Sequence, residues 1–504
     1  MSTDTTASAE ATYEEFIDHV ERLGNLGHVS RILNWDQEVM MPEEGTPSRS
    51  GQLSAISAIQ HDLLTDDRLG DMLDELEAAD LDDDRQAVVR EIRRKHDRAT
   101  SVPSDLVEEI SRTASDAHPK WQQARKEDDF SIFAPSLEKL VELRREYAEA
   151  IDPDRDPYEV LFEEYEPYLG IDTAERVLTR LRDELSPLIE EIRESDADLA
   201  TDAFEGTYAT ETQEELARAV LDDLEYEWDR GRLDTAPHPF TSGNQFDARI
   251  TTRFNEADPL GALMSTIHEF GHATYGLGLP DEHYATPLGD ARDMTVHESQ
   301  SRLWENHVGR SQPFWERFLP TMKDYFPDLE DVTPREAYEA ANQVYEDNLI
   351  RVEADELTYH MHIVVRFEIE RDLIRGDLDV EDVPEVWNDK YEEYLGVRPD
   401  TDADGVLQDI HWSHGNFGYF PTYSLGSVLA AQLYAQAEDE IDDLDGKLRN
   451  GEVGPLHDWL TEKIHRHGCR YTTDDLIREA TGEDYTADYF LEYAEEKYGE
   501  LYEL

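Results

Sequence analysis

Two histidines four residues apart carry the strongest chemical signal in the sequence. In the pentapeptide HEFGH, His268 and His272 enclose Glu269. Residues at i and i+4 share one face of a helix, so both imidazoles can bind one cation while the carboxylate acts on a water beside it. The spacing therefore predicts a metal-dependent hydrolase. The alternative is a helix with two ordinary surface or core histidines.

A catalytic zinc site generally takes three protein ligands, so a further residue is required. The metzincin pattern would place a histidine at position 278, where the sequence has Gly278. Glu282 and His283 lie close downstream, but they follow Pro280 and are predicted to lie in a loop. The third ligand is thus expected farther along the chain, and a carboxylate is the common choice.

Glu298 is the best-placed carboxylate. The segment MTVHESQSRLWEN predicts a helix that starts near Thr295 and can pack antiparallel against the HEFGH helix. We therefore predict that His268, His272 and Glu298 bind the metal. The alternative is that Glu298 only pairs with Arg302 at i+4.

The elements that must position these residues are mostly helices. Apolar stripes at helical spacing occur at residues 13–23 and 177–188, and residues 82–151 predict two or three long helices. Residues from about 231 to 254 are rich in β-branched and aromatic residues, and Phe246, Ala248, Ile250 and Thr252 alternate with polar neighbours. The sequence predicts a mainly α protein with one small sheet.

Charge narrows the classes of partner. The 504 residues carry 46 Lys and Arg against 118 Asp and Glu, a formal net charge of −72. Binding a nucleic acid requires basic clusters that neutralise phosphates, so nucleic-acid partners are excluded. So acidic a surface suits a cytosol with molar salt, where repulsion is screened, and indicates a halophilic source.

Other features favour a cytoplasmic protein. Cys469 is the only cysteine, so no internal disulfide can form, and the first residues resemble no secretion signal. The apolar stretch from Leu425 is about half the length of a membrane span, so no membrane association is expected.

Six short blocks occur in the order found in the carboxypeptidase Taq family of metallocarboxypeptidases. They are HPF at 238–240, DARIT at 247–251, HEFGH at 268–272, HES at 297–299, IRVEAD at 350–355 and GVLQDIHW at 405–412. Weaker matches, WDQEVMMP at 35–42 and GYFPTYSLG at 418–426, extend the resemblance over nearly the whole chain. The resemblance implies a helical homodimer with a deep groove, and one divalent metal per subunit, zinc or alternatively cobalt.

The resemblance also implies an activity and a set of roles. A member of this family would remove C-terminal residues of broad identity from peptides. His268, His272 and Glu298 would be the metal ligands and Glu269 the general base.

Four further residues receive expected roles in this comparison. Arg351 is similar to the family's arginine for the substrate carboxylate; its alternative is a pair with Asp355. Arg249 is a competitor for that role, or else a partner of Asp247. His411 and Tyr423 are candidates for stabilising the oxyanion, or else packed core residues.

We therefore expect residues 1–504 to form a single compact peptidase unit. Residues 1–170 would form a helical arm and groove wall, and residues 171–504 the catalytic part with the small sheet, the HEFGH helix, the third-ligand helix and the C-terminal helices. Three functions stay open: a metallocarboxypeptidase acting on peptides, a zinc endo-oligopeptidase, and a non-enzymatic helical binding protein.

Overall fold

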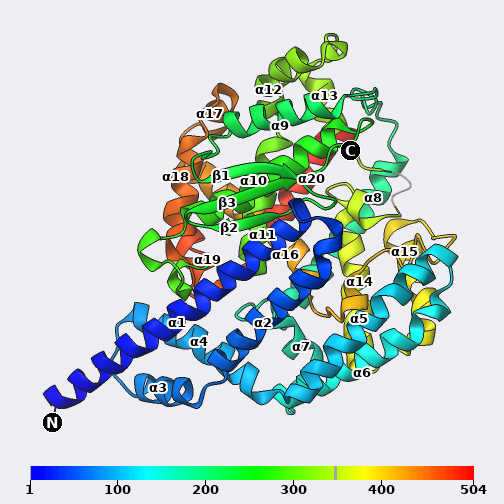
Figure 1. The fold of residues 1–504 in the computed structure, drawn as a ribbon. Helices are drawn as coiled ribbons and strands as arrows, with labels where there is room; N and C mark the ends of the chain where they lie inside the picture. The colour runs from blue at the N-terminus through cyan, green and yellow to red at the C-terminus, as the bar shows by residue number, and fades with distance from the viewer. Residues whose placement is uncertain (1, 346–348) are drawn as a thin grey trace.

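The computed structural model describes residues 2–345 and 349–504 and consists mainly of helices (Figure 1). A long first helix leads into a series of helices at one side of the molecule. The N-terminal helices are α1 (Ser2–Val39), α2 (Thr46–Leu64), α3 (Asp67–Glu77), α4 (Asp83–Ser101), α5 (Ser104–Glu127), α6 (Ala134–Ile151) and α7 (Pro157–Phe162). Three of them, α4 to α6, occupy the region where two or three long helices were predicted.

A three-stranded sheet follows two further helices, α8 (Ile171–Glu194) and α9 (Thr210–Asp223). Its strands are β1 (Gly231–Thr235), β2 (Thr241–Asn244) and β3 (Asp247–Thr252), in the order β1-β3-β2. The central strand β3 pairs in parallel with β1 and antiparallel with β2. The predicted small sheet is confirmed, and the fold is mainly α.

One detail of the strand prediction is wrong. Ala248, Ile250 and Thr252 are buried as expected, but Phe246 is 49% exposed. Phe246 lies in the turn between β2 and β3, where alternation along a strand no longer decides which side chains face the core.

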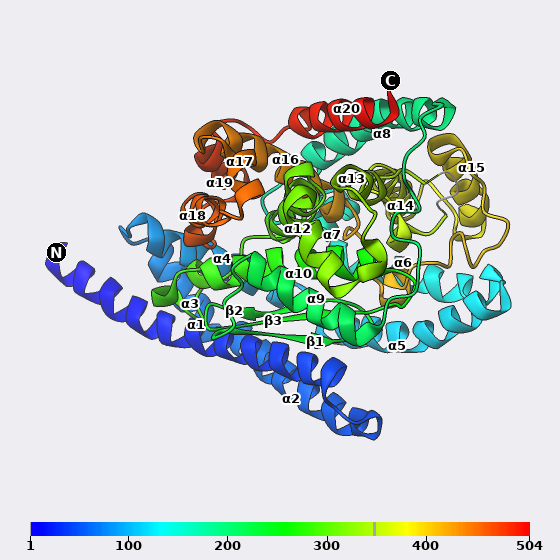
Figure 2. The same ribbon diagram turned by 90° about the horizontal axis from the view of Figure 1, so that it is seen from above.

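The sheet lies between helices on its two faces. In Figure 2, α10 (Pro259–Gly278) lies over one face and α1 crosses the other. Trp35 of α1 packs beneath the guanidinium groups of Arg232 and Arg249, which lie 4.9 and 4.3 Å from its ring centre. The sheet therefore connects the N-terminal helices to the HEFGH helix.

The helix predicted to carry the third ligand, α11 (Met294–Arg302), is followed by nine further α-helices among the described residues. They are α12 (Gln312–Tyr325), α13 (Pro334–Ala341), α14 (Thr358–Arg375), α15 (Val383–Leu395), α16 (Pro421–Glu440), α17 (Leu444–Asn450), α18 (Gly454–Lys463), α19 (Thr473–Thr481) and α20 (Asp488–Tyr502). Most of α16 is buried, and it packs between α11 and α20. A seven-residue π-helix, η5 (Leu303–Gly309), continues α11 without a break.

The hydrophobic core crosses the boundary expected near residue 170. The main cluster runs from Ala117 to Tyr502, so α5 to α7 share it with the later helices. A smaller cluster joins α1, α3 and α4 to Leu288. The division into an arm and a catalytic part stays a prediction. Among the described helices, none is both long enough and apolar enough to cross a bilayer.

Candidate active site

Two antiparallel helices bring the predicted ligands together. Asp258 caps the start of α10 by accepting the N–H of Gly261, and Asp293 caps α11 by accepting the N–H of Val296. The helices approach closely at Gly271, where a Cβ atom would lie 2.5 Å from a backbone oxygen of α11. The absence of a side chain at Gly271 allows this contact.

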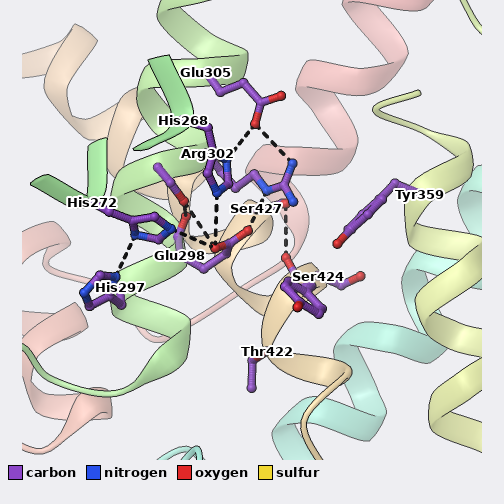
Figure 3. A network of polar contacts seen from close by, with 12 residues as sticks. His268, His272, His297, Glu298, Arg302, Glu305, Tyr359, Thr422, Ser424 and Ser427 are labelled. Carbon is purple, nitrogen blue, oxygen red and sulfur yellow. Dashed lines mark hydrogen bonds and ion pairs between the residues drawn. The ribbon is translucent and has the colours of Figure 1, made fainter. Parts of the chain in front are cut away.

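The donor atoms of His268, His272 and Glu298 converge on one point (Figure 3). Glu298 Oε2 lies 3.8 Å from His268 Nε2 and 3.4 Å from His272 Nε2. All three donor atoms lie within 4.8 Å of one another. Two imidazole nitrogens and one carboxylate oxygen are the donor set of a hydrolytic zinc site, so the residues fit a single divalent ion.

Glu298 also forms the ion pair that was its alternative interpretation. Arg302 Nε donates to Glu298 Oε1 at 2.8 Å, while Oε2 faces the histidines. The two interactions use different oxygens and are compatible. Burial alone would raise the pKa of Glu298, but Arg302 and the two histidines outweigh burial and hold it well below its usual range.

A second layer orients the imidazoles. His268 Nδ1 lies 2.9 Å from Glu305 Oε2, and His272 Nδ1 lies 2.6 Å from His297 Nδ1 (Figure 3). Such partners fix which ring nitrogen is free to bind a metal. Burial, followed by the nearby His272, lowers the pKa of His297 to about 3, so His297 is neutral and can accept the His272 proton.

Sequence reasoning missed Glu305 because it considered only neighbours at i+4. Glu298, Arg302 and Glu305 follow at intervals of four and three, which places them on one helical face. The π-helix η5 carries Glu305, and Arg302 donates to both carboxylates, at 2.8 Å to Glu298 and 3.2 Å to Glu305. The pattern was a usable signal for a carboxylate behind His268.

Glu269 lies on the sheet side of α10. It is buried, and the Thr241 hydroxyl of β2 lies 2.7 Å from Glu269 Oε2 and 2.8 Å from its backbone oxygen. The sheet therefore positions the carboxylate next to the ligand helix. Thr241 is a second functional candidate that the sequence motifs did not single out.

Arg351 lines a cavity of about 1300 Å³. Its Nε and Nη2 donate to Asp409 Oδ1 at 3.0 and 2.9 Å, and Arg366 Nε donates to Asp409 Oδ2 at 2.5 Å. The ion-pair partner of Arg351 is thus Asp409; Asp355 accepts the N–H of Thr358 at the start of α14. Two guanidinium groups share one carboxylate, which leaves one positive charge.

Tyr423 and His411 lie near this cavity in different settings. Tyr423 lines it, and its ring lies 5.3 Å from the Arg351 guanidinium carbon. Burial raises the pKa of Tyr423 well above its usual range, so the hydroxyl keeps its proton. The His411 ring packs on Tyr419 and Phe420, and its Nδ1 is 3.9 Å from Asp409. Their catalytic roles stay predictions.

Arg249 pairs with Asp247, which was the alternative to a role in substrate binding. Its guanidinium donates to Asp247 at 2.6 to 3.1 Å and lies over Trp35 of α1. Arg249 does not line the 1300 Å³ cavity. Among the described residues, the arginines that line this cavity are Arg253 and Arg351. Arg249 thus contacts its own sheet and α1, whereas Arg351 lines the cavity.

The fold and the site together define a mainly α metallopeptidase. The chain matches the profile of the carboxypeptidase Taq (M32) metallopeptidases over residues 15–498 and belongs to this family. It is a metal-dependent carboxypeptidase.

Known proteins match over their full length. Thermostable carboxypeptidase 1 of Thermus thermophilus is 39% identical, with 98% of this chain and 99% of the relative covered. Carboxypeptidase 1 of Bacillus subtilis is 35% identical, with 97% and 99% covered. The crystal structure of the M32 carboxypeptidase from Deinococcus radiodurans R1 has a TM-score of 0.94 at 37% identity, with 98% of this chain and all of that chain covered.

These comparisons decide among the three functions left open by the sequence. The carboxypeptidase prediction is confirmed.

Proposed function

We propose that this carboxypeptidase binds zinc through His268, His272 and Glu298 and uses Glu269 as its general base. The observation that carries the proposal is the convergence of two Nε2 atoms and Glu298 Oε2 on one point, with each side chain fixed from behind. Nitrogen and carboxylate donors suit zinc, and cobalt is the alternative ion.

The bound ion would supply Lewis-acid activation of a water and of the scissile carbonyl. Glu269 takes a proton from the attacking water and passes it to the leaving amine. The Thr241 hydroxyl keeps the Glu269 carboxylate in place during both transfers. Tyr423, whose proton is retained, and His411 are the proposed donors to the developing oxyanion.

Arg351 would bind the terminal carboxylate of the peptide. A planar guanidinium can hold a carboxylate through two parallel hydrogen bonds. The surplus positive charge of Arg351 and Arg366 over Asp409 supports this role. A positive charge at this position would favour peptides whose free C-terminal carboxylate lies next to the scissile bond. The enzyme would therefore release single C-terminal residues of broad identity.

The test compares a peptide with its C-terminally amidated form. For the wild-type enzyme, amidation removes the terminal charge and is expected to lower kcat/KM. Arg351→Gln is expected to lower kcat/KM for the free acid about 30-fold or more and to remove most of the discrimination between the free acid and the amide. Arg253→Gln is the matched control, because Arg253 is the other arginine lining the cavity. If Arg253→Gln alone removes the discrimination, Arg351 is not the carboxylate site.

We also propose a homodimer located in the cytoplasm. The dimer rests on family resemblance, and the single buried Cys469 suits a reducing compartment. Light scattering should give twice the 58.0 kDa mass of the chain, and cell fractionation should place the enzyme with cytoplasmic markers. A mass of one chain, or recovery outside the cytoplasm, would contradict the respective proposal.

A further inference from the structure

A second cavity, of about 470 Å³, is lined by Gly276 near the end of α10, whereas the Arg351 cavity is lined by Gly261 and Ser265 near its start, so the two histidines lie between them along the helix. Its wall includes His297, which contacts His272, and Thr241, which contacts Glu269. It shares none of its lining residues with the cavity that contains Arg351. The proposed catalytic residues therefore lie between two separate spaces, each of a size that binds ligands.

Among the described residues, four cations line this second cavity, and one of them, Arg292, pairs with Glu91. The other three are Arg31 of α1 and Arg94 and Lys95 of α4. Among residues 2–345 and 349–504, none of the three forms an ion pair. Arg31 donates to the Gly243 oxygen at 3.3 Å and Arg94 to the Glu163 oxygen at 3.3 Å, so both contact neutral carbonyl groups. A cluster of three cations without an ion pair is unusual in a chain of net charge −72.

Arg94 is held where an anion would stabilise it. Its Nε is buried and has no hydrogen-bond partner in the described part of the chain. Burial, the largest cause, lowers the pKa of Arg94 from its ordinary value. Lys95 is exposed at the same wall and can follow a ligand into the cavity.

The acidic residues of the wall are largely occupied elsewhere. Glu91 forms two hydrogen bonds with Arg292, and Glu164 pairs with Arg144 at 2.7 Å. Asp293 caps α11. Asp290 and Asp293 are the two lining carboxylates for which the described residues provide no ion pair, and Asp293 is held by hydrogen bonds from Val296 and Thr473. In the part of the chain that the structure describes, three cations without an ion pair thus face two carboxylates without one.

We propose that this cavity receives the part of the peptide upstream of the scissile bond and selects acidic side chains there through Arg31, Arg94 and Lys95. The proposal rests on the assignment of the terminal carboxylate to the Arg351 cavity, because the upstream residues must then leave on the opposite side of the metal site. An ion pair between one of these cations and an acidic side chain of the peptide is in direct contact, so salt screens it less than it screens attraction over longer distances.

The test uses peptides that differ only upstream. Three peptides share the same last three residues and carry Glu-Glu, Gln-Gln or Lys-Lys before them, and kcat/KM is measured at one fixed potassium chloride concentration. The wild-type enzyme should prefer the glutamate peptide to the lysine peptide by about 3-fold to 10-fold. Cleavage of the glutamine peptide shows that the carboxypeptidase itself is active.

Charge reversal at the cavity should reverse the preference. Lys95→Glu is expected to lower the glutamate-to-lysine ratio about 3-fold or more, and Arg31→Gln to lower it in the same direction. Lys126→Glu is the matched control, because Lys126 is exposed on α5 outside the cavity, and it should leave the ratio at the wild-type value.

Three results would overturn the proposal. The first is a wild-type enzyme that does not distinguish the peptides. The second is an equal loss on all three peptides in Lys95→Glu, which would mean that the cavity binds the terminal carboxylate. The third is inhibition by inorganic phosphate that Lys95→Glu relieves without any change in the peptide ratio, which would mean that the cavity binds a free anion.

Discussion

At the scale of single residues, each proposed ligand has two functions that different atoms carry out. Glu298 uses one oxygen toward the histidines and the other toward Arg302, and His268 uses one nitrogen toward Glu298 and the other toward Glu305. This arrangement fixes the donors before an ion binds. Pre-fixed donors reduce the reorganisation that binding would otherwise require.

Glu269→Gln provides the residue-scale test of the chemistry. The amide cannot take a proton from water, so kcat should fall about 10²-fold to 10⁴-fold. Metal content should stay at the wild-type value, because Glu269 contacts Thr241 and supplies no donor atom to the triad. Turnover and metal content are measured on the same preparation.

Glu282→Gln is the control for this substitution. Glu282 is an exposed carboxylate in the short 3₁₀ helix η3 (Asp281–His283) after α10, so its loss should change neither quantity. Activity of Glu269→Gln within a factor of about three of wild type would disprove the general-base role.

At the scale of elements, one helix contact depends on a glycine. A Cβ at Gly426 of α16 would lie 2.5 Å from Glu298 Cβ and 2.6 Å from Glu298 Cγ. α16 can pack on α11 only because position 426 has no side chain. The proposed third ligand is therefore positioned by its own helix and by the one behind it.

Gly426→Ala should displace Glu298. We expect metal affinity to fall about 10-fold or more and the free energy of unfolding to fall by about 1–3 kcal/mol. Gly499→Ala on α20 is the matched control, since no atom lies within 4 Å of its added Cβ. That substitution should stabilise the helix by about 0.5–1 kcal/mol and leave metal affinity unchanged. Equal metal affinity in both variants would refute the packing argument.

The elements also show how far sequence reasoning reaches. Spacing and helix signals were enough to predict α10, α11 and the small sheet, because local pattern determines them. The exposure of Phe246, the π-helix that carries Glu305 and the pairing of Arg351 with Asp409 were not predictable. Each depends on a turn geometry or on contacts between residues distant in the chain, and periodicity contains no information about either.

At the scale of the whole molecule, charge dominates. The chain has a net charge of −72, and its acidic side chains repel one another. The Debye length, over which this repulsion acts, is about 10 Å at 0.1 M salt but only about 3 Å at 1 M. We therefore expect the melting temperature to rise by about 5 °C or more between 0.1 and 2 M potassium chloride. Thermal unfolding followed by circular dichroism measures the melting temperature. A control with sucrose at equal osmolality separates the screening of charges by salt from the stabilisation that any excluded solute gives. An unchanged or lower Tm in salt would contradict the halophilic interpretation.

The most direct test of the central claim is an anomalous-scattering map of crystals grown with zinc. The account predicts one peak per chain, within bonding distance of His268 Nε2, His272 Nε2 and a carboxylate oxygen of Glu298. A peak bound elsewhere, or Glu298 turned away from an ion held by the two histidines, would contradict the account.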